Sequence, residues 1–335
     1  MKSIQNFRSA IHGLFSDQIF KPTQRFFRKE AASSLLLLAT TIIALAWANF
    51  PVFASYHPIW HTNVGFTIGE ATINKSLIHW INDGLMALFF FTVGLEIKRE
   101  LLVGELSTPK KALFPVVAAI GGMAVPGIIF ALINYNTPSA GGWAIPMATD
   151  IAFALGALAL LGSRVPKKLL TFLVALAIVD DLGAVMVIAL FYTETISIPA
   201  LSIATVMLIL LISLTLGGIR RPLPYVLLGI ILWIAMWKSG VHATLAGIFL
   251  AFTIPMRPKY EPARFLTHIN EMVEQIKKAY KHEENIVIND ELRSRVRALG
   301  EGVKLVQAPA QIMERTLHLP TAYLIIPILF LIISL

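Results

Sequence analysis

Long apolar stretches dominate this sequence and limit what the chain can fold into. The chain has 335 residues, of which 56% are hydrophobic and 14% are charged. About 20 consecutive apolar residues are needed to cross the hydrocarbon core of a membrane as a helix. The sequence therefore predicts an all-α polytopic membrane protein with about nine transmembrane helices, at residues 32–50, 78–97, 112–134, 143–162, 169–192, 198–217, 223–238, 242–256 and 320–335.

Basic residues alternate between the links that join these stretches. Lys98, Arg99, Lys110 and Lys111 follow the second stretch, whereas the link before it holds only Lys75. Because cytoplasmic links carry the excess of Lys and Arg, we expect the amino terminus in the cytoplasm. The net charge of +8 follows this alternating distribution, which is a topology signal, so we expect membrane lipid and no nucleic acid as a partner. Cysteine is absent, which excludes disulfides and thiol chemistry.

The predicted spans divide the chain into a cytoplasmic amphipathic arm at 1–31, a membrane domain at 32–256 with spans one to eight, a cytoplasmic insertion at 257–319 and a ninth span at 320–335. Ile4, Phe7 and Ile11 have helical spacing, which fits a helix on the membrane surface, with an unstructured tail as the alternative. The first span also resembles a signal peptide, but the polar region before it is long for one. The insertion is expected to contain helices around 268–283 and 290–305, in a solvated or a regulatory segment.

Residues 63–74 alternate in polarity and carry Gly69 and Glu70 at a tight turn. This pattern predicts a small outer β-hairpin. The open edges of a hairpin can pair with a second copy of the chain. We therefore expect a homodimer through residues 63–74, with an isolated surface hairpin as the alternative.

Three carboxylates, Asp150, Asp180 and Asp181, lie inside the apolar stretches. A charged side chain at the bilayer centre costs roughly 2.5–3.5 kcal/mol on insertion scales, and such residues mark ion or proton pathways. Two adjacent carboxylates repel each other, so the pair should hold protons or a cation. Oxygen ligands suit a hard cation such as Na⁺. The alternative is a structural pair bound to a lysine.

Pro146 precedes Asp150 by four residues and removes one backbone donor, so the helix at 143–162 should be interrupted. Unwound backbone at membrane depth is tolerated where it is buried in protein or lines a cavity. Thr149 adds a hydroxyl beside the acid. The segment therefore predicts a cation site, with a proline kink and a paired aspartate as the alternative.

Other titratable residues lie near the ends of the predicted spans. Glu96, Lys98 and Arg99 form a charge cluster with Glu100 at the end of the second span. This cluster fits either a response to pH or an anchor of the topology. His242 fits either pH sensing or a hydrogen bond within the packed protein.

Several of these segments together resemble the NhaA family of sodium/proton antiporters. They are Trp80–Phe90, Val93–Glu100, Ala148–Gly156, Leu161–Pro166, Ala175–Ala184 and Ser239–Gly247. The resemblance implies an inverted-repeat antiporter fold in a bacterial inner membrane. It implies a pH-regulated secondary transporter, not an enzyme, that exports Na⁺ or Li⁺ in exchange for a larger number of protons and uses no cofactor.

The resemblance also implies a role for each candidate residue. Asp181 corresponds to the principal ion-binding carboxylate and Asp180 to its partner. Asp150 and Thr149 correspond to the crossing of two interrupted helices. The pH response is assigned to Glu96, Lys98, Arg99 and His242, and dimerisation to the hairpin at 63–74.

Family members continue for three spans after the ninth, whereas this sequence ends at Leu335. We therefore expect a fold that lacks the last three spans. One alternative function is a non-transporting, truncated remnant of such an antiporter. Another is an intramembrane aspartyl protease that uses Asp150 and Asp181. Against the protease, Asp181 is flanked by Asp180 and Leu182 and not by the glycines that such enzymes carry.

Overall fold

The structure is a computed structural model, and its helices and strands assign the chain to the mostly helical class. Contacts divide the chain into two compact units. Unit 1 contains Met1–Ile81, Glu100–Val187 and Ala322–Leu335, and unit 2 contains Asn82–Arg99 and Ile188–Thr321. The structure describes residues 22–50, 56–68, 71–149, 151–161, 164–192, 196–258, 269, 271, 273–275, 293–294, 296–300 and 307–332.

Seven of the described helical segments are long and apolar enough to cross a membrane. They are Ala32–Asn49, Leu77–Val103, Pro109–Ile133, Lys168–Phe191, Ile198–Leu216, Pro222–Ser239 and Pro309–Ile332. Their large apolar side chains remain exposed, as for Leu113, Val117 and Leu132 of the third segment. An apolar surface of this extent needs lipid to cover it, so the chain is a multi-pass membrane protein.

The predicted number of nine spans is not confirmed. Seven predicted spans correspond to the seven segments above. Among the described residues, the α-helices in the stretches at 143–162 and 242–256 are the short helices α7 (Ile151–Leu161) and α11 (Leu245–Thr253). With 11 and nine residues, α7 and α11 are too short to cross the hydrocarbon core as regular helices. The inverted-repeat fold and the expected lack of the last three spans stay predictions.

The final helical segment begins at Pro309 instead of residue 320. It consists of α14 (Pro309–Pro320), a π-helical turn (Thr321–Ile325) and α15 (Ile326–Ile332). Polar residues made the sequence of α14 resemble the insertion, but Pro309, Ala310 and Met313 form a buried face on this helix. Described residues in the predicted insertion helices are helical at 269, 271, 273–275, 293–294 and 296–300.

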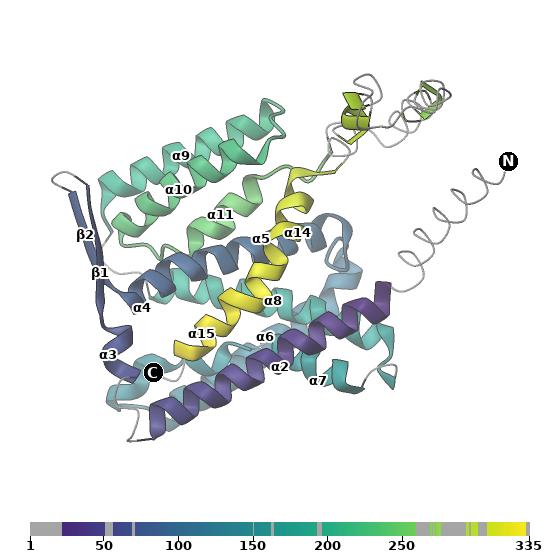
Figure 1. Ribbon diagram of the computed structural model, residues 1–335. Helices are drawn as coiled ribbons and strands as arrows, with labels where there is room; N and C mark the ends of the chain where they lie inside the picture. The colour runs from purple at the N-terminus through teal and green to yellow at the C-terminus, as the bar shows by residue number, and fades with distance from the viewer. Residues whose placement is uncertain are drawn as a thin grey trace. The chain divides into compact units, whose positions relative to one another are not determined.

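In unit 1, the first long helix, α2 (Pro22–Asn49), packs against α7 and α15 (Figure 1). An aromatic group of Trp47, Tyr56 and Trp60 closes one end of this packing, and the latter two belong to α3 (Tyr56–Trp60). The Tyr56 hydroxyl donates a hydrogen bond to the Leu331 carbonyl oxygen at 2.7 Å. The predicted surface helix of the amino-terminal arm lies outside the described residues.

Unit 1 also contains the predicted hairpin, and the structure confirms it. Strands β1 (Asn63–Ile68) and β2 (Ala71–Ser76) are antiparallel, with Asn63 opposite Ser76 and Ile68 opposite Ala71. Trp80 at the end of α4 (Leu77–Trp80) donates from Nε1 to the Val64 carbonyl at 2.9 Å, which ties the hairpin to the helix that follows it. Gly69 and Glu70, at the predicted turn, lie outside the described residues.

Unit 2 is built around α9 (Ile198–Leu216), α10 (Pro222–Ser239) and α11, which pack against one another (Figure 1). Helix α10 begins with a proline at its first position and ends at Gly240, whose φ of 81° is left-handed. Most of α5 (Met86–Val103) also belongs to this unit.

Two glycines allow α5 and α11 to approach closely. A Cβ atom at Gly247 of α11 would overlap the carbonyl oxygen of Ala87 and lie 2.8 Å from the backbone nitrogen of Phe91. A Cβ atom at Gly94 of α5 would lie 2.8 Å from the Cβ atom of Ala251. Small residues at such crossings let helix backbones meet in membrane proteins.

Candidate functional site

The predicted helix interruption is present in unit 1. Residues Pro138–Gly142 and Ile145–Met147 form 3₁₀ turns, Ala148 is extended with φ −71° and ψ 130°, and α7 begins only at Ile151. Pro146 lacks a backbone N–H, so it cannot continue a regular helical hydrogen-bond ladder here. Thr149 therefore lies in non-helical backbone between the last 3₁₀ turn and α7.

The interrupted segment meets α8 (Lys167–Phe191) through a side-chain hydrogen bond. Thr149 Oγ1 donates to Asp180 Oδ2 at 2.7 Å. Asp180 is 6% exposed, and its other oxygen, Oδ1, is buried and meets no hydrogen-bond donor among the described residues. One oxygen of a buried carboxylate is therefore available to a proton or a cation.

Apolar packing lies close to this carboxylate. Ala177 and Ile178 of α8 are buried, and Leu176 and Val179 pack against a core formed by Ala119, Met123 and Met147. An apolar environment makes an unpaired charge costly and strengthens any interaction that compensates it. An unpaired negative charge on Asp180 would therefore be costly in this environment.

Of the other two predicted carboxylates, the structure describes Asp181 but not Asp150. Asp181 is half-buried in α8, and its side chain leaves the helix about 100° from that of Asp180. Asp150 lies outside the described residues. The structure thus brings Thr149 and Asp180 together, while the ion-binding roles of all four residues stay predictions.

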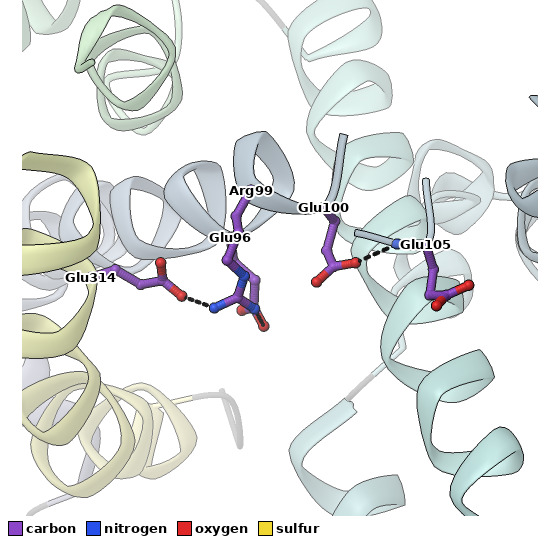
Figure 2. A network of polar contacts seen from close by, with 5 residues as sticks. All are labelled: Glu96, Arg99, Glu100, Glu105 and Glu314. Atoms are coloured by element: carbon purple, nitrogen blue, oxygen red, sulfur yellow. Dashed lines mark hydrogen bonds and ion pairs between the residues drawn. The ribbon is translucent and has the colours of Figure 1, made fainter. Parts of the chain in front are cut away.

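Part of the predicted pH-response group forms a polar cluster in unit 2. Figure 2 shows Arg99 of α5 paired with Glu314 of α14, and its Nη2 atom lies 3.6 Å from Glu96 Oε1. Sequence reasoning missed Glu314 because residue 314 was assigned to the insertion. The amphipathic spacing of Ala310, Met313 and Leu317 was the signal that could have found this helix.

Glu100 makes a separate local contact. Its Oε2 atom accepts a hydrogen bond from the Glu105 backbone nitrogen at 2.9 Å, just after the end of α5 (Figure 2). The carboxylate therefore satisfies a backbone donor in the turn that follows the helix.

Lys98 and His242 bind backbone carbonyls instead of acidic side chains in the structure. Lys98 Nζ donates to the carbonyl oxygen of Phe252 at 2.7 Å and to that of Ile254. His242 Nε2 lies 2.9 Å from the Tyr192 carbonyl oxygen, a contact that requires a proton on Nε2. The pH-response roles of these residues, like those of Glu96 and Arg99, stay predictions.

Comparisons with known proteins agree with the predicted family. The family described as Na⁺/H⁺ antiporter 1 matches residues 24–334. The chain is 49% identical over 312 residues to Na(+)/H(+) antiporter NhaA 1 of Saccharophagus degradans, covering 93% of this chain and 67% of the relative. It is 45% identical to Na(+)/H(+) antiporter NhaA of Sulfurimonas denitrificans, covering 93% and 70% respectively.

A third relative has higher identity over a shorter region. Na(+)/H(+) antiporter NhaA of Salmonella arizonae is 51% identical over 253 residues, which cover 74% of this chain and 65% of that protein. The match of the family to almost the whole chain and the identity to these relatives lead to one conclusion. The chain belongs to the Na⁺/H⁺ antiporter 1 family.

Proposed function

We propose that this chain exchanges Na⁺ for protons across a membrane at a site formed by Thr149, Asp150, Asp180 and Asp181. The observation that carries the proposal is the buried Oδ1 atom of Asp180, which no donor among the described residues satisfies. Membership of a family of Na⁺/H⁺ antiporters and relatives with that name support it.

The exchange follows from the cost of an empty, charged site. A carboxylate in an apolar environment is stabilised either by a proton or by a bound cation, and the two compete for the same oxygens. Arrival of Na⁺ displaces the proton, and arrival of a proton displaces Na⁺. A proton gradient that loads the site from one side can therefore drive Na⁺ out through the other.

The two adjacent carboxylates have distinct proposed roles. Asp181, the more exposed of the pair, is the principal Na⁺ ligand, and Asp180 is its buried partner oriented by Thr149. Two carboxylates can release two protons when one Na⁺ binds, so more protons than sodium ions cross in a cycle. Li⁺, which is also a hard cation, is a second substrate in this proposal.

Regulation and assembly belong to the same proposal. Arg99 and its acidic partners Glu96 and Glu314 supply a response to pH in this proposal. The hairpin of β1 and β2 has open edges that can pair with a second copy of the chain in a homodimer. The amino terminus faces the cytoplasm of a bacterial cell in this arrangement.

Flux measurements on reconstituted protein test the proposal. The chain is inserted into proteoliposomes with an acidic interior, and a pH-sensitive dye reports the lumen after Na⁺ is added outside. We expect Na⁺ to alkalinise the lumen for the unsubstituted chain and for the control Glu105→Gln, and to have no effect for Asp181→Asn. A flat response of correctly inserted, unsubstituted chain supports the remnant instead. An unchanged response of Asp181→Asn removes that carboxylate from the mechanism.

A further inference from the structure

The carboxyl end of α11 presents several backbone carbonyls without partners in their own helix. The last four carbonyls of any α-helix lack an intrahelical donor. Here Thr253, Ile254 and Pro255 are buried, so water has little access to these three residues, whereas Phe252 is exposed. A buried carbonyl without a donor costs free energy, above all in a protein surrounded by lipid.

Lys98 of α5 satisfies two of these carbonyls. Its ammonium group donates to the oxygen of Phe252 at 2.7 Å and to that of Ile254. An ammonium carries three donors and a full positive charge, which suits the negative end of the helix dipole. Lys98 thus acts as a cap supplied by another helix.

Two further donors satisfy the remaining carbonyls. Thr215, in the last turn of α9, donates from Oγ1 to the Thr253 oxygen at 2.5 Å. The backbone nitrogen of Ala310, at the start of α14, donates to the Pro255 oxygen at 3.3 Å. Every carbonyl from Phe252 to Pro255 therefore has a donor: Lys98 serves two of the four, and Thr215 and Ala310 serve one each.

The two glycine contacts between α5 and α11 explain how Lys98 reaches this end. Gly94 precedes Lys98 by one helical turn, so both lie on the same face of α5. The close approach of Gly94 to Ala251 brings the end of α11 within reach of the lysine side chain. With nine residues, α11 is too short to be stable alone and depends on such contacts.

We propose that Lys98 is a positioning residue for transport and that its ammonium holds the carboxyl end of α11 against α5. The role of Lys98 therefore differs from that of its chain neighbour Arg99, which pairs with Glu314 and Glu96. The importance of Lys98 for transport rests on the proposed exchange of Na⁺ and protons. The capping contact itself does not depend on that exchange.

Hydrogen exchange at individual amides tests the cap without any transport. In Lys98→Met, we expect the amides of 249–254 to exchange at least about tenfold faster, because the last turn of α11 frays. Amides of α2 in unit 1 should keep their rates. Lys98→Arg, which retains the charge, should restore part of the protection. The control is Lys238→Met, which removes an exposed lysine from the last turn of α10.

Chemical rescue distinguishes the loss of the ammonium group from other effects of the substitution. Lys98→Ala leaves a gap the size of propylammonium, so adding this cation should slow exchange at 249–254 again. The uncharged isostere propanol at equal concentration should not. Thr215→Val provides a second variant, with Thr205→Val as its control, because Thr205 donates to the Leu201 carbonyl of its own helix.

Transport kinetics complete the test. We expect Lys98→Met to lower the maximal rate about tenfold while the midpoint of the pH profile stays in place. Unchanged exchange at 249–254 together with a shifted midpoint would assign Lys98 to the pH response and overturn the proposal. Equal acceleration of exchange throughout the chain would also overturn it. If the unsubstituted chain shows no Na⁺-driven flux, the proposed function fails, whereas the exchange data still decide the cap.

Discussion

The interrupted segment before α7 and the end of α11 are both irregular regions in a mostly helical protein, but their polar atoms are satisfied differently. At α11, each carbonyl from Phe252 to Pro255 has a donor. Beside the interrupted segment, Asp180 has one bond from Thr149 and a buried Oδ1 that meets no donor among the described residues. The end of α11 therefore has the fully bonded character of a structural region, whereas Asp180 beside the interrupted segment can still accept a ligand.

This difference predicts opposite responses to substitution. A buried polar atom without a partner lowers stability, and proteins keep such atoms where function requires them. A fully bonded region contributes stability, so its substitution should cost free energy of unfolding.

Replacement of Asp180 should abolish transport without destabilising the protein. Asn keeps the shape and can still accept a hydrogen bond from Thr149, but it neither releases a proton nor neutralises Na⁺. We expect Asp180→Asn to reduce Na⁺-driven proton flux by about a thousandfold or more. The free energy of unfolding should stay equal or rise by about 1 kcal/mol, because a buried charge is removed.

Flux in proteoliposomes and thermal unfolding in detergent measure these two effects. Loss of transport together with a large loss of stability would mean that Asp180 has a structural role, like the residues around α11. Retained transport would exclude it from the ion site.

A methyl group at the crossing of α5 and α11 should have the largest effect on stability. Gly247→Ala places a Cβ atom against the backbone at Ala87 and Phe91, which cannot move as easily as a side chain. Overpacking of this kind costs typically about 1–3 kcal/mol, and backbone contact favours the upper end. Gly122→Ala in α6 (Pro109–Ile133) is the control, because no described atom beyond its own stretch of helix lies within 4 Å of its Cβ position. Equal unfolding temperatures for the two variants would contradict the close approach of the helices.

Loss of the hydroxyl at Thr149 should weaken Na⁺ binding by a smaller amount. Thr149→Val keeps the shape but removes the donor to Asp180 Oδ2. A hydrogen bond to a charged group contributes about 1.5–3 kcal/mol, so we expect the apparent affinity for Na⁺ to fall at least about tenfold. Thr149→Ser should bind Na⁺ nearly as well as the unsubstituted chain. A Val variant with unchanged affinity would show that this hydrogen bond does not organise the site.

The acidic partners of Arg99 should show the smallest effects. The Glu314 side chain is 15% exposed and pairs closely with Arg99, whereas that of Glu96 is 40% exposed at 3.6 Å. Because Arg99 itself is 35% exposed, solvent screening should limit the loss for Glu314→Gln to about 1 kcal/mol. Glu96→Gln should lose less. Unfolding at low and high salt measures both, and the reverse order would contradict the geometry of this cluster.

Local signals in the sequence were sufficient for much of the fold. Apolar length predicted nine spans, of which seven correspond to long apolar helices. Alternation at 63–74 predicted the hairpin, and Pro146 predicted the interruption that the structure shows. Each of these features depends on neighbouring residues, so a short window of sequence contains the signal.

Contacts between distant residues could not be predicted in this way. The bond from Thr149 to Asp180 depends on how the interrupted segment lies against α8, and nothing near either residue specifies that partner. Lys98 was expected to act with Glu96 and Arg99 because they are neighbours in the chain. In the structure, successive residues of α5 point in different directions, so Lys98 reaches α11 whereas Arg99 reaches α14.

Release of protons on Na⁺ binding tests the central claim most directly. The purified chain is placed in weakly buffered detergent solution, Na⁺ is added, and a pH electrode records the change. We predict that Na⁺ acidifies the solution for the unsubstituted chain and that the release disappears when Asp180 and Asp181 are both replaced by asparagine. Sodium binding without any release of protons, or an unchanged release from the double variant, would contradict competition between the two ions for these carboxylates.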